Sequence, residues 1–147
     1  EIDELGILRD KVIYYPNTHD GCYRFFVKRD PLAHPAVLFR KTFFKKAGLY
    51  NEKFIHNQDT MLWSDGFLNS CVFANISDIV LKYRIDDSFF NNRRNGWSRA
   101  LTFFKIRMII NKKLNYGLFG IIYAMIMFLI TISPPALKKI IYNLFRI

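Results

Sequence analysis

Cysteine is scarce in this sequence, and so are acidic side chains. Its 147 residues include two cysteines, Cys22 and Cys71, which lie far apart and belong to no CxxC motif or Cys/His cluster. This spacing supports neither a disulfide framework nor a zinc site. We interpret both as small buried thiols in a reducing compartment.

The shortage of acid leaves a strongly basic chain. It has 22 Lys and Arg against 12 Asp and Glu, a net charge of +10, and 51% hydrophobic residues. That much apolar sequence excludes a disordered chain. The charge favours an anionic partner: nucleic acid, an anionic membrane leaflet or a phosphate-bearing substrate. No nucleic-acid-binding module is recognisable, and the basic residues flank an apolar stretch instead of lining a groove, so we expect no nucleic acid.

The sequence also lacks an initiator methionine and a signal peptide. It opens with acidic residues, Glu1, Asp3 and Glu4, where a signal peptide would have a basic and then an apolar run. We expect the chain to begin inside a longer protein. Its length suffices for one domain, and it contains no internal repeat and no low-complexity tract.

The first two thirds of the chain show mixed periodicity. Residues 1–31 are polar and rich in turn-formers, with one short strand predicted at 12–15. Further short strands are predicted at 36–39, 72–76 and 79–85. Helices are predicted at 40–47, closed by Gly48, and at 59–68, with Asp59 as the N-cap. Strands mixed with helices in this order predict an α/β or α+β domain.

The last third is helical in pattern. Residues 97–113 form a basic amphipathic pattern, and residues 116–132 carry no charge before Pro134 and Pro135. As a helix, 116–132 would be about 25 Å long, at the short limit for a bilayer core of about 30 Å. One transmembrane helix at 116–132, a helix lying in one leaflet, and a buried core helix are the three readings. Basic residues at both ends favour the second.

Five short runs in the centre carry a family resemblance. They are His34-Pro35-Ala36-Val37-Leu38-Phe39-Arg40-Lys41, Ala47-Gly48-Leu49-Tyr50-Asn51-Glu52, Gln58-Asp59-Thr60-Met61-Leu62-Trp63, Phe73-Ala74-Asn75-Ile76 and Leu81-Lys82-Tyr83-Arg84. In this order and spacing they resemble the second half of bacterial family 2 glycosyltransferases. The resemblance implies a partial GT-A-like domain, the acceptor-side half at residues 1–96. A membrane-associated helical tail would follow at 97–147.

The resemblance also implies a nucleotide-sugar donor, a glycan or lipid-linked acceptor, and transfer with inversion. The family has an acidic pair before Leu-Trp, and the second acid is the general base; here the pair reads Gln58-Asp59. Asp59 therefore corresponds to the base. An inverting transfer needs one carboxylate to accept the proton of the attacking hydroxyl. The alternative is that Asp59 only caps its own helix.

Three neighbours are predicted to bind the acceptor: His34, Gln58 and Trp63. For His34 a purely structural role is the alternative, and for Trp63 a core position on its helix is the favoured alternative. Arg93 and Arg94 are predicted to meet the donor diphosphate through paired hydrogen bonds, or else to be a solvated basic pair. Asp86 stands near the place where many family members have a metal-binding histidine.

The donor half of the family, with its Asp-x-Asp motif, has no counterpart in this sequence. We therefore expect a divalent metal, Mg or Mn, to be held mainly by that missing half and predict no metal site here. The predicted function is that of a C-terminal fragment of a glycosyltransferase in cell-surface polysaccharide synthesis. It would be peripheral or monotopic at the cytoplasmic face of the cell membrane and inactive alone. The alternative is a non-catalytic, membrane-associated remnant or partner module.

Overall fold

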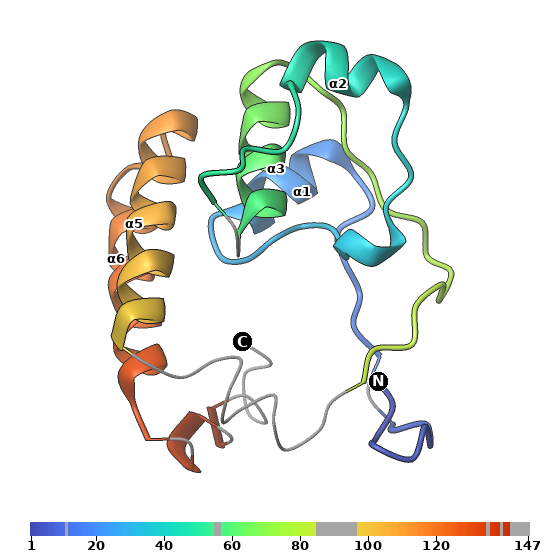
Figure 1. The fold of residues 1–147 in the computed structure, drawn as a ribbon, viewed down its shortest axis with the longest axis vertical. Coiled ribbons are helices and arrows are strands. Elements are labelled where there is room, and N and C mark those ends of the chain that lie inside the picture. Colours follow the sequence, from blue (N-terminus) through green and yellow to red (C-terminus); the bar gives the residue numbers. More distant parts are fainter. Residues whose placement is uncertain (11, 55–56, 85–96, 135, 139, 142–147) are drawn as a thin grey trace.

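The computed structural model describes residues 1–10, 12–54, 57–84, 97–134, 136–138 and 140–141. Helices dominate this part of the chain (Figure 1). They are α1 (His19–Phe26), the 3-10 helix η1 (His34–Ala36), α2 (Lys41–Ala47), α3 (Gln58–Leu68), α5 (Trp97–Leu114) and α6 (Gly117–Ile132).

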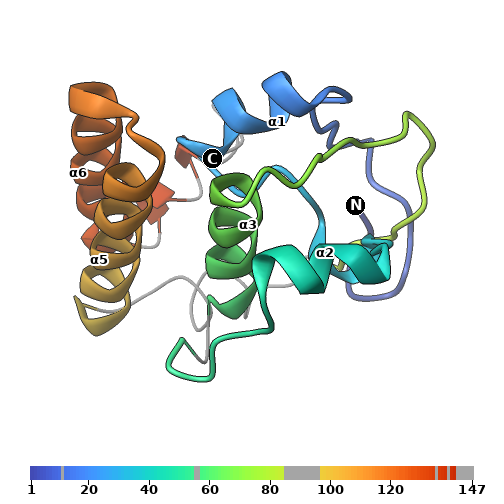
Figure 2. The same cartoon turned by 90° about the horizontal axis from the view of Figure 1, so that it is seen from above.

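Helix α3 occupies the centre of the molecule. Viewed from above, it lies between α5 on one side and α2 on the other, with α1 nearby (Figure 2). Helices α5 and α6 form a hairpin and lie side by side in both views. The turn between them uses Asn115 and Gly117, whose φ values of 55° and 66° lie in the left-handed region.

The core forms around α3. Trp63 is 0% exposed and Leu62 is 1% exposed. Phe26 of α1 and Ile106 and Ile110 of α5 belong to the same buried cluster. Full burial of one such side chain stabilises the fold by about 1.5–3 kcal/mol. Helix α5 therefore packs into the core that α3 organises.

The predicted α/β class is wrong: the described residues contain no strand and no sheet. Segments 12–15, 37–40 and 72–83 run as irregular or extended chain, and pairing is limited to single bridges from Ile2 to Leu8 and from Ile2 to Arg84. A strand needs a neighbour about 4.8 Å away to accept and donate its backbone hydrogen bonds. These segments have the apolar, alternating composition of strands, but among the described residues their strand-like pairing is limited to the contact of Ile2 with residues 83–84.

Helix α1 falls where an irregular loop is predicted. Asp20 and Gly21 are typical of turns, but here they lie in the first turn of α1, where Thr18 Oγ1 accepts a hydrogen bond from the Gly21 N–H at 3.2 Å. Buried Cys22 and Phe26 then lie one turn apart on the same face. The N-cap and this apolar pair give the helix its position.

The helices predicted near 40–47, 59–68, 97–113 and 116–132 are confirmed. Gly48 ends α2 with a φ of 83°, as expected of a glycine after a helix. Helix α6 begins at Gly117 and ends at Ile132, next to Ser133 and Pro134. Within the described residues, we find no helix that combines the length and the apolarity needed to cross a bilayer.

One amide ties the extended segment 72–76 to the helical part. The Asn75 side-chain N–H₂ donates to the carbonyl oxygens of Pro16, at 2.8 Å, and Pro31, at 3.0 Å. These carbonyls flank α1 on either side. Asn75 therefore fixes three stretches of chain that are distant in sequence.

Candidate active site

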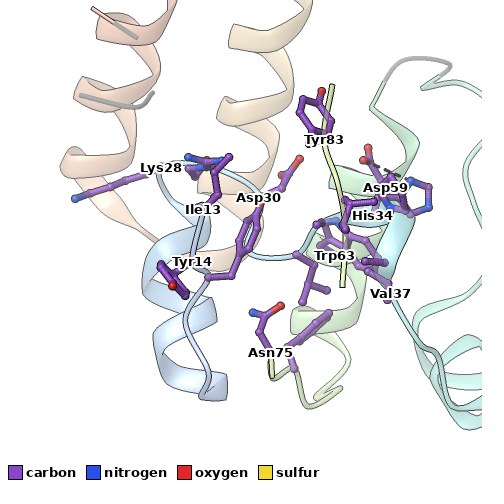
Figure 3. A pocket seen from close by; sticks show the side chains of 18 of the residues that line it. Ile13, Tyr14, Lys28, Asp30, His34, Val37, Asp59, Trp63, Asn75 and Tyr83 are labelled. Atoms are coloured by element: carbon purple, nitrogen blue, oxygen red, sulfur yellow. Dashed lines mark ion pairs between the residues drawn. The ribbon is translucent and has the colours of Figure 1, made fainter. Parts of the chain in front are cut away.

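A broad hollow of about 2040 Å³ opens beside α3 (Figure 3). Segment 28–40, the start of α3, segment 71–83 and parts of α5 and α6 all line it. Pockets for a single small molecule usually have about 300–1,000 Å³. The hollow is thus a wide concave surface, and Asp30, His34 and Asp59 are among the polar residues that line it.

Asp59 projects into this hollow from the first turn of α3 (Figure 3). Its Oδ1 accepts a hydrogen bond from the Thr60 N–H at 2.8 Å, and its side chain is 27% exposed. The predicted N-cap position is wrong, because Asn57 is the N-cap and caps without a side-chain hydrogen bond. A carboxylate here also interacts favourably with the positive end of the helix dipole.

His34 lies beside Asp59, at the start of η1. Its Nδ1 is 3.7 Å from Asp59 Oδ2, and its Nε2 is 2.9 Å from the hydroxyl oxygen of Tyr50. The Trp63 and His34 rings pack in a T-shaped arrangement, with an interplanar angle of 77° and the ring centroids 5.9 Å apart. Burial raises the pKa of the Tyr50 phenol, and the Asp59 carboxylate raises it further. The histidine is therefore held between an acidic and a phenolic side chain.

A second carboxylate, Asp30, lies behind the first. Its Oδ2 accepts a hydrogen bond from Thr60 Oγ1 at 2.7 Å, and its Oδ1 is 3.4 Å from the guanidinium of Arg107. Burial raises the pKa of Asp30, while the nearby Arg107 acts in the opposite direction. Thr60 thus joins Asp30 to the first turn of α3, in which Asp59 lies.

Arg107 is a buried cation, 5% exposed, on α5. It donates to the carbonyl oxygen of Phe26 at 2.7 Å, at the end of α1, where backbone carbonyls lack helical partners. Its guanidinium also lies over the Phe26 and Phe103 rings. Arg107 therefore connects α5, the end of α1 and the Asp30 carboxylate.

The sequence of the chain is similar to that of the amylovoran biosynthesis glycosyltransferase AmsE of Erwinia amylovora. The two are 24% identical over 144 residues, which is 97% of this chain and 53% of AmsE. This supports a glycosyltransferase in general. The chain spans about half the length of this relative. No protein-family profile matches the chain. No solved structure matches it either.

A glycosyltransferase needs a sugar donor and an acceptor. The structure shows which of the residues predicted to contact the acceptor lie together and which are accessible. The structure brings His34, Asp59 and Trp63 together. Trp63 is fully buried, with the Phe39 ring stacked against it at a centroid distance of 5.6 Å, so its ring is not open to an acceptor here. Gln58 precedes Asp59, and its Oε1 is buried without a hydrogen-bond partner among the described residues.

Arg93, Arg94 and Asp86 lie outside the described residues. In the part that the structure describes, no three His, Cys, Asp or Glu side chains gather as a metal site would require. Sequence reasoning missed Tyr50, Asp30 and Thr60. Tyr50 and Thr60 are in the runs that carry the family resemblance, whereas Asp30 has no local signal, because its partners are 30 and 77 residues away.

Proposed function

We propose that this chain is the acceptor-side part of an inverting, family 2-like glycosyltransferase. It would transfer a sugar from a nucleotide-sugar donor to a glycan or lipid-linked acceptor in polysaccharide synthesis. The observation that carries the proposal is Asp59, a partly exposed carboxylate that lines a wide hollow. The similarity to AmsE, named for amylovoran biosynthesis, supports the substrate class.

Asp59 is the general base in this proposal. The acceptor hydroxyl oxygen attacks the anomeric carbon of the donor as the bond from that carbon to the diphosphate oxygen breaks. The hydroxyl proton passes to a free lone pair of the Asp59 carboxylate. One carboxylate suffices, because inversion takes a single displacement. The Thr60 N–H holds Oδ1 at 2.8 Å, which restricts rotation of the carboxylate.

The donor-binding part is proposed to lie on residues beyond this chain. The extended segment 72–80 exposes four apolar side chains: Val72, Ile76, Ile79 and Val80, each at least 63% exposed. Exposed apolar side chains on extended chain outside any described sheet are typical of a surface that another part of a protein covers. A Mg or Mn ion would be held mainly by that other part, and no step is assigned to it here.

Helix α6 offers the surface for the proposed membrane contact at the cytoplasmic face. Six apolar side chains on it are 47–71% exposed. They are Leu118, Phe119, Ile122, Met125, Ile126 and Leu129, which we call the α6 apolar face. Leu118, Ile122, Met125 and Leu129 follow the helical spacing of one stripe. With no charge in α6 and a net charge of +10, the chain suits a helix lying in the interface of an anionic leaflet.

Substitution of Asp59 tests the function in the full-length enzyme. Asp59→Asn keeps the size of the side chain and removes its basicity. With a panel of nucleotide sugars and measured release of nucleoside diphosphate, we expect turnover to fall by about 10²- to 10⁴-fold. Binding of the donor and the melting temperature should stay close to wild type, because the Thr60 N–H can donate to the Asn oxygen instead.

The matched control is Asp20→Asn, an exposed acid in the first turn of α1. It should leave turnover unchanged. Near wild-type turnover in Asp59→Asn would mean that the base lies elsewhere. An enzyme with no transfer or hydrolysis of any nucleotide sugar, though folded and bound to donor, would favour the non-catalytic module.

A further inference from the structure

His34 makes two polar contacts that differ in kind. Its Nε2 is within hydrogen-bond distance of Tyr50 Oη, at 2.9 Å, while its Nδ1 is 3.7 Å from Asp59 Oδ2. A neutral imidazole has one N–H and one bare nitrogen, so the two contacts cannot both be donations. The environment of the ring therefore has to select one of two tautomers.

Electrostatics select the tautomer with the proton on Nδ1. A bare Nδ1 would direct its lone pair at the Asp59 carboxylate, whereas an Nδ1–H directs a positive group at it. Nε2 is then the bare nitrogen, and the Tyr50 hydroxyl donates to it. Burial raises the pKa of Tyr50, which keeps the phenol protonated and able to donate. The polarity of the chain thus runs from Tyr50 through His34 to Asp59.

We propose that Tyr50 and His34 are positioning residues for Asp59, with the Tyr50 hydroxyl fixing the His34 tautomer whose Nδ1–H orients the Asp59 carboxylate. This rests on the proposed role of Asp59 as the base. At 3.7 Å the Nδ1 contact is longer than a hydrogen bond, and contacts of this kind commonly tighten when the substrate binds.

In this arrangement, each oxygen of the Asp59 carboxylate has a polar contact with a protein group that orients it. Oδ1 accepts from the Thr60 N–H at 2.8 Å, and Oδ2 faces the His34 Nδ1–H. The hydrogen bond on Oδ1 and the polar contact of the Nδ1–H with Oδ2 restrict rotation of the carboxylate, which lines the hollow. The acceptor hydroxyl would meet the carboxylate in a fixed direction, which is the geometric requirement for proton transfer.

The first test reads the tautomer directly and needs no substrate. We propose to record long-range ¹H–¹⁵N spectra of the histidine rings in the ¹⁵N-labelled chain at about pH 8.5, above the usual histidine pKa of about 6.5. A His34→Gln variant assigns the His34 signals. Wild type should show mainly Nδ1–H. Tyr50→Phe should shift the tautomer ratio toward Nε2–H roughly five- to tenfold, as expected for loss of one hydrogen bond.

Tyr14→Phe is the matched control, because Tyr14 is 70% exposed and lines the same hollow away from His34. It should leave the His34 signals in place. A wild-type ring found mainly as Nε2–H, or a Tyr50→Phe spectrum identical to wild type, overturns the proposal whatever the activity of the enzyme.

The second test is a double-mutant cycle in the full-length enzyme. Tyr50→Phe alone should lower kcat roughly tenfold with little change in KM. The substitution misorients the Asp59 base, and Asp59 is not proposed to take part in donor binding. In the Asp59→Asn background the same substitution should cost no further activity, since its effect passes through Asp59. Equal losses in both backgrounds would show that Tyr50 acts independently of Asp59 and would overturn the proposal.

The two tests separate the failures. If Asp59→Asn retains full turnover, the proposed function of Asp59 is wrong, and the positioning role falls with it. The tautomer measured in the first test would still report whether Tyr50 donates to His34. A shifted tautomer together with a non-additive cycle supports the proposal as a whole.

Discussion

The helical core and the extended segments have similar apolar side chains but opposite exposure. Leu62 in α3 is 1% exposed, whereas Leu38, just after η1, is 98% exposed. Both belong to apolar runs in the sequence. A helix satisfies its own backbone hydrogen bonds and can bury one face alone, but an extended segment needs a neighbour to do either. Whether an apolar side chain of this chain is buried therefore depends on whether its segment packs against another segment.

The largest contrast should come from one substitution made in both regions. Leu62→Ala should lower the free energy of unfolding by about 2–5 kcal/mol, because it leaves a cavity in the packed cluster. Leu38→Ala should change it by about 0.5 kcal/mol or less. Urea denaturation followed by circular dichroism measures both. Equal losses at the two positions would mean that Leu38 is buried in solution and that the contrast is false.

Arg107 tests how far the core depends on its polar connection to α5. Arg107→Met keeps the length of the side chain but leaves Asp30 without its cation and the Phe26 carbonyl without its donor. We expect a loss of about 2–3 kcal/mol in the free energy of unfolding. Lys105→Met, at an exposed position of the same helix, is the control and should be nearly neutral. If both variants have the same free energy of unfolding, the Arg107 guanidinium adds no stability beyond that of its aliphatic stem.

The α6 apolar face is the second exposed apolar region, and vesicles distinguish it from the extended segments. Ile122→Gln with Met125→Gln retains good helix formers and should weaken flotation with anionic vesicles by an order of magnitude or more, given the lost apolar burial. Leu38→Gln changes an apolar residue elsewhere that is even more exposed, at 98%, and this variant should float like wild type. Neutral vesicles should bind less well, since each basic residue near an anionic surface adds about 1 kcal/mol.

Failure of wild type to bind either kind of vesicle would remove the membrane proposal. Equal binding to neutral and anionic vesicles would retain the apolar contact and remove the electrostatic part.

The smallest effect concerns Asp30 and pH. Its pKa is raised above the ordinary 3.8, chiefly by burial, so the folded chain binds this proton more tightly than the unfolded chain. Its contribution to stability is fully present below about pH 4 and is lost as the pH rises through the raised pKa. Asp30→Asn should flatten this part of the pH dependence in urea titrations, and Asp20→Asn should not. Parallel curves for Asp30→Asn and wild type would contradict a raised pKa.

The helices could be predicted where their signals are local. The spacing of apolar residues and the glycine after Ala47 place α2, and the uncharged run before Ser133 places α6. The short strands could not be predicted correctly, because alternation describes a strand only when another segment pairs with it. Ile79 and Val80 alternate in sequence, yet they are 67% and 63% exposed. Pairing is a property of distant residues, so no window of sequence contains it.

The candidate site divides in the same way. Asp59 and His34 could be predicted from the runs that resemble a family. Their contact with each other and with Tyr50 depends on how η1 and the loop after α2 fold against α3. Asp30 and Arg107 are 77 residues apart, and only the packing of α5 on α3 brings them together. The sequence around Asp30 and the sequence around Arg107 contain no local signal that predicts this contact.

The Asn75 amide makes the structure sensitive to the age of a protein sample. Asparagine side chains hydrolyse slowly to aspartate, and they are among the residues least durable to heat. The product at this position would have no N–H₂ to give, and its carboxylate would face the carbonyl oxygens of Pro16 and Pro31. Deamidation of this one residue would remove the hydrogen bonds that join segment 72–76, which lines the hollow, to the chain on either side of α1. Freshly prepared and long-stored protein would then differ at the candidate site by a single atom and its charge.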